Sequence, residues 1–192
     1  MIVRVGASSS TRSLLQTATE VLVTDPAASL ADVARAAGIG RTTLHKLYPT
    51  RHALLVALAV DALDLLESTY AEVGLDVPGH EVPAALRRLV TAMIPMGPRL
   101  EFLLRERSLD IEPELLTRLE ALDAPVRAAV RRAQSGGVLG ADLTDEWIVS
   151  AINSLVYAAW EQIALGRLAP VAAPDLVMRT VLHGIAVTIG EH

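Results

Sequence analysis

Five polar side chains within residues 41–46 have the size and charge to recognise nucleic-acid bases. They are Arg41, Thr42, Thr43, His45 and Lys46. A threonine can donate or accept a hydrogen bond, or lay its methyl group against a thymine methyl, whereas arginine and lysine reach guanine edges or phosphates. At helical spacing Leu44 and Leu47 are expected on the opposite, inward side. A short helix with such a small, cationic outer face suits the major groove of DNA.

The residues that flank this helix predict a complete helix-turn-helix. A first helix is indicated by apolar residues at helical spacing, which are Leu30, Val33, Ala34 and Ala37. Gly38 then permits the positive φ of a sharp turn. We expect three further residues, at or beside helix starts, to contact DNA phosphates, namely Ser29, Tyr48 and Arg51. Alternatively, the Tyr48 ring only packs.

This motif resembles that of the TetR family of transcriptional repressors over about residues 11–58. The segments that carry the resemblance are Ala37-Gly38-Ile39-Gly40, Thr43-Leu44-His45 and Tyr48-Pro49-Thr50-Arg51. The family usually has tyrosine where this chain has His45, and often serine where it has Gly40, so single contacts differ. The resemblance implies a ligand-responsive repressor that binds a pseudo-palindromic DNA operator as a homodimer and is released by a small-molecule effector.

The pattern along the chain predicts helices and no strands. Besides the motif we expect helices at 11–24, 51–73, 84–94, 99–109, 113–134, 145–165 and 174–189. Pro125 is expected to kink or split the helix at 113–134. The sequence therefore predicts an all-α fold. Its three-helix DNA-binding head would occupy residues 1–53, and six helices for ligand binding and dimerisation would occupy residues 54–192.

Composition fits this interpretation. The 192 residues are 52% hydrophobic and 20% charged, which is enough apolar material for a sizeable core. Residues 1–60 carry six Arg/Lys and three Asp/Glu, and residues 61–192 carry eleven and nineteen, so charges of +3 and −8 make up the net −5. A basic N-terminal part would attract phosphate. The chain has no cysteine, which fits the cytoplasm, and we expect no membrane span.

Large or polar-tipped side chains of the C-terminal part are candidates for an effector pocket. They are Tyr70, Met93, Met96, Phe102, Trp147, Asn153, Tyr157 and Trp160. Asn153, Tyr157 and Trp160 follow at i, i+4 and i+7 and so share one side of a helix. Aromatic residues are few, so we expect an apolar or amphipathic small molecule. Alternatively, these are ordinary core side chains.

The last two expected helices have apolar stripes that could form a dimer interface. The candidate residues are Ala151, Val177, Val181, Leu182, Ile185 and Ile189. Two such helices from each of two chains would form a four-helix bundle across a two-fold axis. Alternatively, these helices are buried within their own chain.

No pattern of catalytic residues stands out. The five histidines form no metal-binding pair with Asp or Glu on one helix face, and no glycine-rich loop follows a strand. We therefore expect no enzyme activity, no metal and no cofactor. Two alternatives remain open. One is a TetR-like ligand-binding or interaction protein that has lost sequence-specific DNA binding, and the other is a small helical enzyme.

Overall fold

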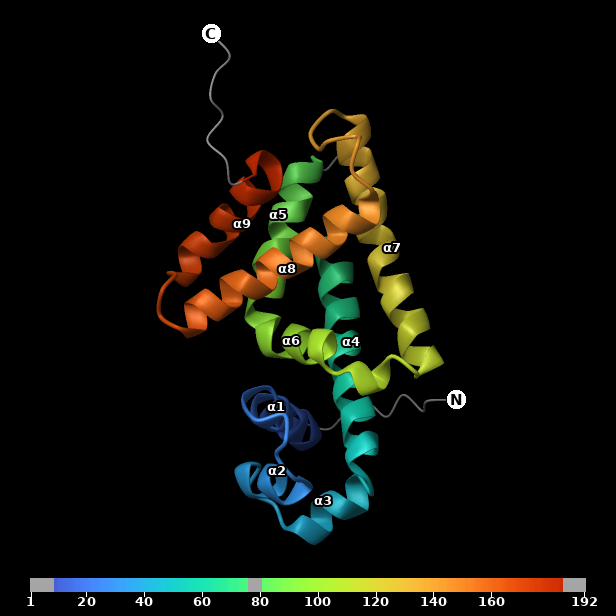
Figure 1. Cartoon of the computed structure of the whole chain (residues 1–192), viewed down its shortest axis with the longest axis vertical. Coiled ribbons are helices and arrows are strands. Elements are labelled where there is room, and N and C mark those ends of the chain that lie inside the picture. The colour runs from blue at the N-terminus through green and yellow to red at the C-terminus, as the bar shows by residue number, and fades with distance from the viewer. Residues whose placement is uncertain (1–8, 76–80, 185–192) are drawn as a thin grey trace. The chain divides into compact units, whose positions relative to one another are not determined.

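The computed structural model describes residues 9–75 and 81–184, which form helices and their connections (Figure 1). The α-helices are α1 (Ser9–Thr24), α2 (Leu30–Ala36), α3 (Arg41–Leu47), α4 (Arg51–Val73), α5 (Val82–Met93), α6 (Gly97–Arg105), α7 (Pro113–Ser135), α8 (Asp145–Ala164) and α9 (Ala173–His183). Short 3-10 turns are η1 (Ile94–Met96), η2 (Arg107–Leu109) and η3 (Pro170–Ala172). The predicted all-α class is confirmed, since no strand occurs among these residues.

The chain divides into two compact units. The first unit comprises Met1–Leu65 and Pro98–Leu116, and the second comprises Leu66–Gly97 and Thr117–His192. The sequence pattern did not indicate that residues 98–116 group with the helix-turn-helix. These units are defined by compactness, so the functional boundary predicted after residue 53 stays a prediction.

In the first unit α2 packs against both α1 and α3. The apolar face of α1 supplies its core together with residues of the other helices, and the buried side chains include Leu14, Leu15, Leu22, Val33, Leu44, Leu54 and Leu58. The N-terminal end of α4 is fixed by Thr50, whose Oγ1 accepts a hydrogen bond of 3.0 Å from the Ala53 amide. Threonine is one of the residues preferred at this capping position.

In the second unit α5, α8 and α9 pack against one another (Figure 1). Their buried faces meet in an aliphatic core that includes Leu86, Leu89, Val90, Ile152, Val156 and Val177. Arg118 at the start of α7 contacts Glu67 near the end of α4, with 2.9 Å between Nη2 and Oε1. Thr144 caps α8 by accepting a hydrogen bond of 3.2 Å from the Trp147 amide.

Two expectations about the helices need correction. Pro125 does not split α7, which continues from Pro113 to Ser135 with Leu122 and Val126 buried on either side of the proline. Instead of a break before residue 99, η1 leads directly into α6 at Gly97. In the described part α9 ends at His183, where Gly184 has a φ of +70° and caps the helix. The expected continuation to 189 lies outside the described residues.

Candidate functional site

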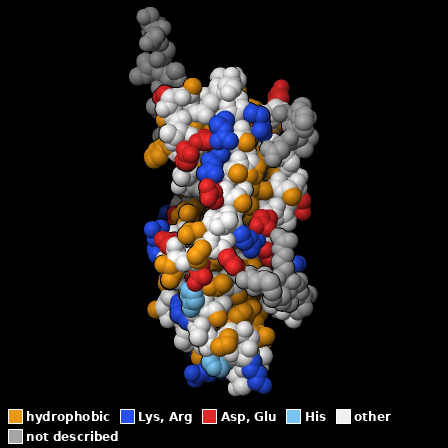
Figure 2. All heavy atoms as spheres, turned by 90° about the vertical axis from the view of Figure 1, so that its right-hand side faces the viewer, with side chains coloured by type: hydrophobic (Ala, Val, Ile, Leu, Met, Phe, Trp, Pro, Cys, Tyr) orange, Lys and Arg blue, Asp and Glu red, His pale blue; other side chains and the backbone are white. Residues whose placement is uncertain are grey.

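The exposed side of α3 is the first candidate site. Leu44 is 0% exposed and anchors the helix, whereas all five predicted reading residues are exposed. Figure 2 shows arginine, lysine and histidine side chains gathered at the end of the first unit that α3 forms. With its φ of +67°, Gly38 makes the turn before α3, and Gly40 caps that helix without a side-chain hydrogen bond. This arrangement brings Arg41, Thr42, Thr43, His45 and Lys46 onto one short, accessible helix.

Leu47 does not face inward with Leu44 as expected. Its side chain is 52% exposed, although the spacing predicted that it would be buried with Leu44. The reason is its position at the last residue of α3, because Tyr48 leaves the helical conformation with φ −132° and ψ 91°. The exposed surface of α3 therefore includes a large apolar side chain beside the polar ones.

Ser29 has a structural role at the start of α2. Its Oγ donates a hydrogen bond of 2.6 Å to Asp32 Oδ2, and the same carboxylate oxygen accepts one of 2.9 Å from the Ser29 amide. The Asp32 amide in turn donates to Ser29 Oγ at 3.3 Å, which completes a capping box. These bonds from Ser29 lower the pKa of the Asp32 carboxyl. A phosphate contact by Ser29 stays a prediction.

Arg51 holds the loop between α1 and α2. Its guanidinium donates to the carbonyl oxygen of Pro26 at 2.5 Å and also to that of Ala28. The two terminal nitrogens, Nη1 and Nη2, thus satisfy backbone acceptors immediately before Ser29. A phosphate contact by Arg51 stays a prediction, and in this structure its planar fork is directed to the protein backbone. The sequence motif could not reveal that the Arg51 guanidinium donates to two backbone carbonyl oxygens.

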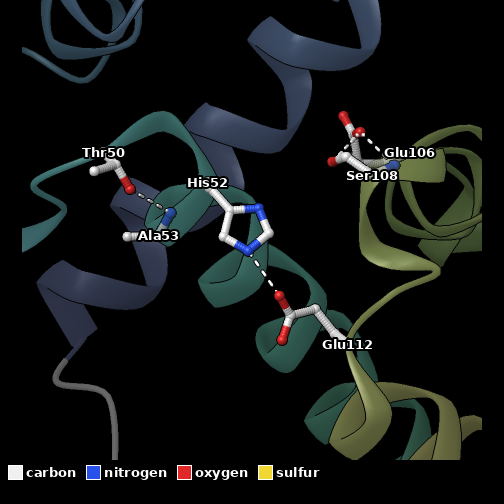
Figure 3. Close-up of polar contacts among 6 residues, drawn as sticks. All are labelled: Thr50, His52, Ala53, Glu106, Ser108 and Glu112. Carbon is white, nitrogen blue, oxygen red and sulfur yellow. Dashed lines mark hydrogen bonds and ion pairs between the residues drawn. The ribbon is translucent and has the colours of Figure 1, made fainter.

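Tyr48 and His52 lie on either side of the turn from α3 into α4. Tyr48 is half-buried, and burial raises the pKa of its phenol, with the nearby Asp61 carboxylate adding to the effect. Its ring therefore packs, which was the alternative prediction for this residue. His52 is turned towards Glu112, with 2.7 Å between Nε2 and Oε1 (Figure 3). His52 thus faces a carboxylate.

The predicted pocket residues on α4, α5 and η1 are buried together in the second unit. The Tyr70 hydroxyl lies 3.7 Å from Met93 Sδ, and Thr69 Oγ1 lies 3.7 Å from Met96 Sδ. Burial is the largest cause of a raised pKa for the Tyr70 phenol, so this side chain stays protonated at neutral pH. These side chains form a soft, mostly apolar cluster with hydroxyl groups within it.

Trp160 of α8 covers the start of α6. A Cβ atom built on Gly97 would lie only 1.9 Å from the indole Cγ, so the ring packs directly on the glycine backbone. The Tyr157 and Trp160 ring centroids are 5.8 Å apart with an interplanar angle of 41°. Asn153, Tyr157 and Trp160 are all partly exposed on α8. The glycine that permits this packing was not singled out from the sequence.

Two of the predicted pocket residues do not join this group. Trp147, in the first turn of α8, is 65% exposed, so no protein surface encloses its side chain. Phe102 is buried, but it belongs to the first unit, whereas the other seven lie in the second. A pocket role for Trp147 and Phe102 stays a prediction.

The predicted interface residues divide in a similar way. Val177 is 2% exposed because α9 packs on α5 and α8, so its own chain covers it. Ala151, Val181 and Leu182 are partly exposed, and Ile185 and Ile189 lie outside the described residues. The prediction did not name the exposed residues of α8 that recur at helical spacing, which include Trp147, Ser150, Ser154, Ala158 and Leu165, with the partly exposed Glu161 on the same side. Their period of three to four residues was the signal that could have found them.

Two negative findings apply to the described residues. Within 9–75 and 81–184, no group of three or more His, Cys, Asp or Glu side chains is placed to hold a metal ion. None of the helices in this part of the chain is long and apolar enough to cross a membrane.

Comparison with known proteins gives one curated relative and many solved structures. The chain is 39% identical over 124 residues to the HTH-type transcriptional repressor LfrR of Mycolicibacterium smegmatis, a match that spans 65% of each chain. No protein-family model matches.

The solved structures agree in fold over nearly the whole chain. The TetR-like regulator LfrR in complex with proflavine superposes with a TM-score of 0.76 at 30% identity, covering 94% of this chain and 99% of that one. A TetR family regulator from Marinobacter aquaeolei gives 0.71 at 17% identity, covering 91% and 95%, a likeness of fold alone. The proteins matched are transcriptional regulators rather than enzymes. By its helix-turn-helix, its all-α fold and its identity to LfrR, this chain belongs to the TetR family of ligand-responsive transcriptional regulators.

Proposed function

We propose that this chain is a transcriptional repressor that binds operator DNA as a homodimer and is released by a small molecule. The observation that carries the proposal is the exposed face of α3, where five polar side chains lie on a short helix anchored by the buried Leu44. A helix of seven residues fits within the width of a major groove. Similarity to the repressor LfrR supports repression as the outcome of binding. The site of action would be the cytoplasm.

The second unit would bind the effector. LfrR has been solved with proflavine, a flat aromatic dye, and the candidate pocket here offers soft and aromatic side chains to such a molecule. Met93, Met96 and Trp160 could rearrange around an apolar or amphipathic ligand, because thioether side chains adapt readily to irregular shapes. Tyr70 and Asn153 would supply hydrogen bonds.

Dimerisation would use α8 and α9. On α8 the small side chains of Ser150, Ala151, Ser154 and Ala158 recur at helical spacing and are exposed or partly exposed. Small residues let two helices approach closely. Val181 and Leu182 on α9 are partly exposed and could complete the interface. A two-fold dimer would present two α3 helices to the two half-sites of an operator.

The effector and the operator would oppose each other through linkage. If the effector binds better to a dimer whose reading helices are wrongly spaced, it must weaken DNA binding by the same factor by which DNA weakens effector binding. No contact between effector and DNA is needed for this coupling.

A binding titration tests the proposal. The full chain is titrated onto the duplex upstream of its own gene and onto a scrambled duplex, at several salt concentrations. We expect tighter binding to the upstream duplex and a slope of log K against log salt of roughly −7, for about eight phosphates neutralised per dimer.

The alternative is a TetR-like protein that has lost specific DNA binding. Two observations favour it, since Gly40 provides no side-chain cap and Arg51 is held by backbone carbonyls instead of being directed to a phosphate. Equal and weak binding to both duplexes would favour this alternative over repression.

A further inference from the structure

The leucine at the end of α3 is about half exposed, so packing in the core does not fully account for its side chain. Leu47 is 52% exposed, whereas Leu44, three residues earlier, is 0% exposed and holds the helix to the first unit. Leu47 therefore contributes little to the core. Its position on the helix that carries the predicted reading residues gives it a different significance from that of a scattered surface leucine.

The helical register places Leu47 beside a base-reading residue. Residues four apart are neighbours on a helix surface, so Leu47 follows Thr43 on one line and Lys46 follows Thr42 on the next. All four of these side chains are exposed. A helix that enters a major groove with Thr43 towards the bases brings Leu47 close to the base pairs one turn further along.

The chemistry of leucine limits what it can contact there. Its side chain has no hydrogen-bond donor or acceptor, so it gains nothing from a phosphate oxygen. In the major groove the apolar feature of a base pair is the C5-methyl group of thymine. Guanine, adenine and cytosine edges would instead lose hydrogen bonds to water against a leucine, which penalises those bases at the same position.

We propose that Leu47 is a specificity-determining residue that contacts the methyl group of one thymine in each operator half-site. This inference rests on the proposed function, since it requires α3 to enter the major groove. It adds an apolar contact to the hydrogen bonds expected from Thr42 and Thr43. The operator would then prefer thymine at a position about one helical turn of α3 away from the base that Thr43 contacts.

The test removes single methyl groups from the DNA. The full-length chain first selects its tightest sites from random duplexes, and each thymine of the selected site is then replaced by deoxyuridine, which lacks only the methyl group. For the wild-type chain we expect one replacement per half-site to weaken binding about fourfold, the effect of one buried methyl. The Leu47→Ala variant should lose less than twofold at that position.

Two control variants make the result specific. Thr43→Ser removes the methyl group of the neighbouring residue and should keep the sensitivity at the Leu47 position. Leu47→Met keeps an apolar side chain and should also keep it, provided that circular dichroism shows native helicity. If Leu47→Ala unfolds, a loss of the methyl sensitivity in Leu47→Gln tests the same contact.

The outcomes separate this inference from the proposed function. If no sequence is enriched, the proposed function fails. If a site is selected but every sensitive thymine stays equally sensitive without Leu47, or if no thymine is sensitive, the operator is read without this contact and the inference is overturned.

Discussion

The role of Arg51 follows from what its guanidinium contacts rather than from its place in a motif. Its donors satisfy the carbonyl oxygens of Pro26 and Ala28 in the loop that leads to the capping box of α2. Carbonyls left without partners in a partly buried turn would be costly. Lys46, in contrast, is exposed on α3 and is available to contact a phosphate. Arg51 thus stabilises the protein backbone, whereas Lys46 is expected to bind DNA.

The variants Arg51→Ala and Lys46→Ala should therefore differ in the salt dependence of DNA binding. Lys46→Ala is expected to reduce the slope of log K against log salt by about 0.9 for each phosphate that is no longer neutralised. Arg51→Ala should leave the slope unchanged and destabilise the fold by about 1–3 kcal/mol, because two carbonyls lose their donors. Salt titrations and thermal unfolding check both. A reduced slope together with unchanged stability for Arg51→Ala would instead indicate that Arg51 contacts a DNA phosphate.

The two threonines of α3 should act on specificity. Thr42 and Thr43 lie in the first turn of the helix, where base edges are usually reached, and their short side chains touch only what is directly beneath them. Thr42→Ala or Thr43→Ala is expected to cost about 1–3 kcal/mol on the cognate duplex and little on a scrambled one. Titrations at fixed salt measure both, and equal losses on the two duplexes would assign these residues to general affinity.

At the level of elements, the start of α6 depends on one glycine. Gly97 is the first residue of α6, and the Trp160 ring of α8 occupies the space that a side chain would need. Because Trp160 packs on Gly97, a movement of this ring in the candidate pocket would also affect the backbone where α6 begins. The break expected before residue 99 is absent, because η1 leads directly into α6. The packing of Trp160 on Gly97 supports this connection, and no local sequence pattern reveals it.

Gly97→Ala should displace Trp160. A Cβ within 1.9 Å of the ring forces the indole to move, and such overpacking costs about 1–3 kcal/mol. Gly136→Ala is the matched control, because its Cβ would meet nothing closer than a backbone oxygen at 3.4 Å. In a Trp147→Phe background Trp160 is the sole tryptophan, so its emission reports the shift. Unchanged emission and stability in Gly97→Ala would show that the ring is not held there.

Sequence patterns predicted those features that depend on neighbouring residues. The positive φ of Gly38 and the bounds of α4 both follow from local sequence patterns. Features that depend on distant partners escaped prediction. The exposure of Leu47 and the packing of Trp160 on Gly97 are decided by residues remote in the sequence or by where a helix ends.

At the scale of the whole molecule, the two candidate sites belong to different compact units. The helix α3 lies in the first unit, and the candidate pocket with Trp160 lies in the second. The charge is also unequal, with +3 in residues 1–60 and −8 in residues 61–192. Attraction for DNA is thereby concentrated in the part of the chain that carries α3, while the acidic remainder disfavours binding to DNA at other surfaces.

Dimerisation should depend on the face of α8 that carries Ser150, Ser154 and Ala158. Ala158→Arg places a large charged side chain on this face, and a charge buried without a partner opposes association by several kcal/mol. Ala121→Arg on α7 is the matched control, because Ala121 is also an exposed helical alanine. Sedimentation should show a monomer for Ala158→Arg and a dimer for the control. A dimeric Ala158→Arg variant with native helicity would move the interface elsewhere.

The central claim is that a molecule bound in the second unit controls DNA binding by the first. The direct measurement is the affinity for the upstream duplex with and without saturating proflavine, for the wild-type chain and for Trp160→Ala. We predict that the wild-type affinity falls about 5–150-fold, the usual range of allosteric coupling, while the variant changes much less. An equal loss in both would show that the dye acts on the DNA alone, and no loss in the wild type would contradict control by this ligand.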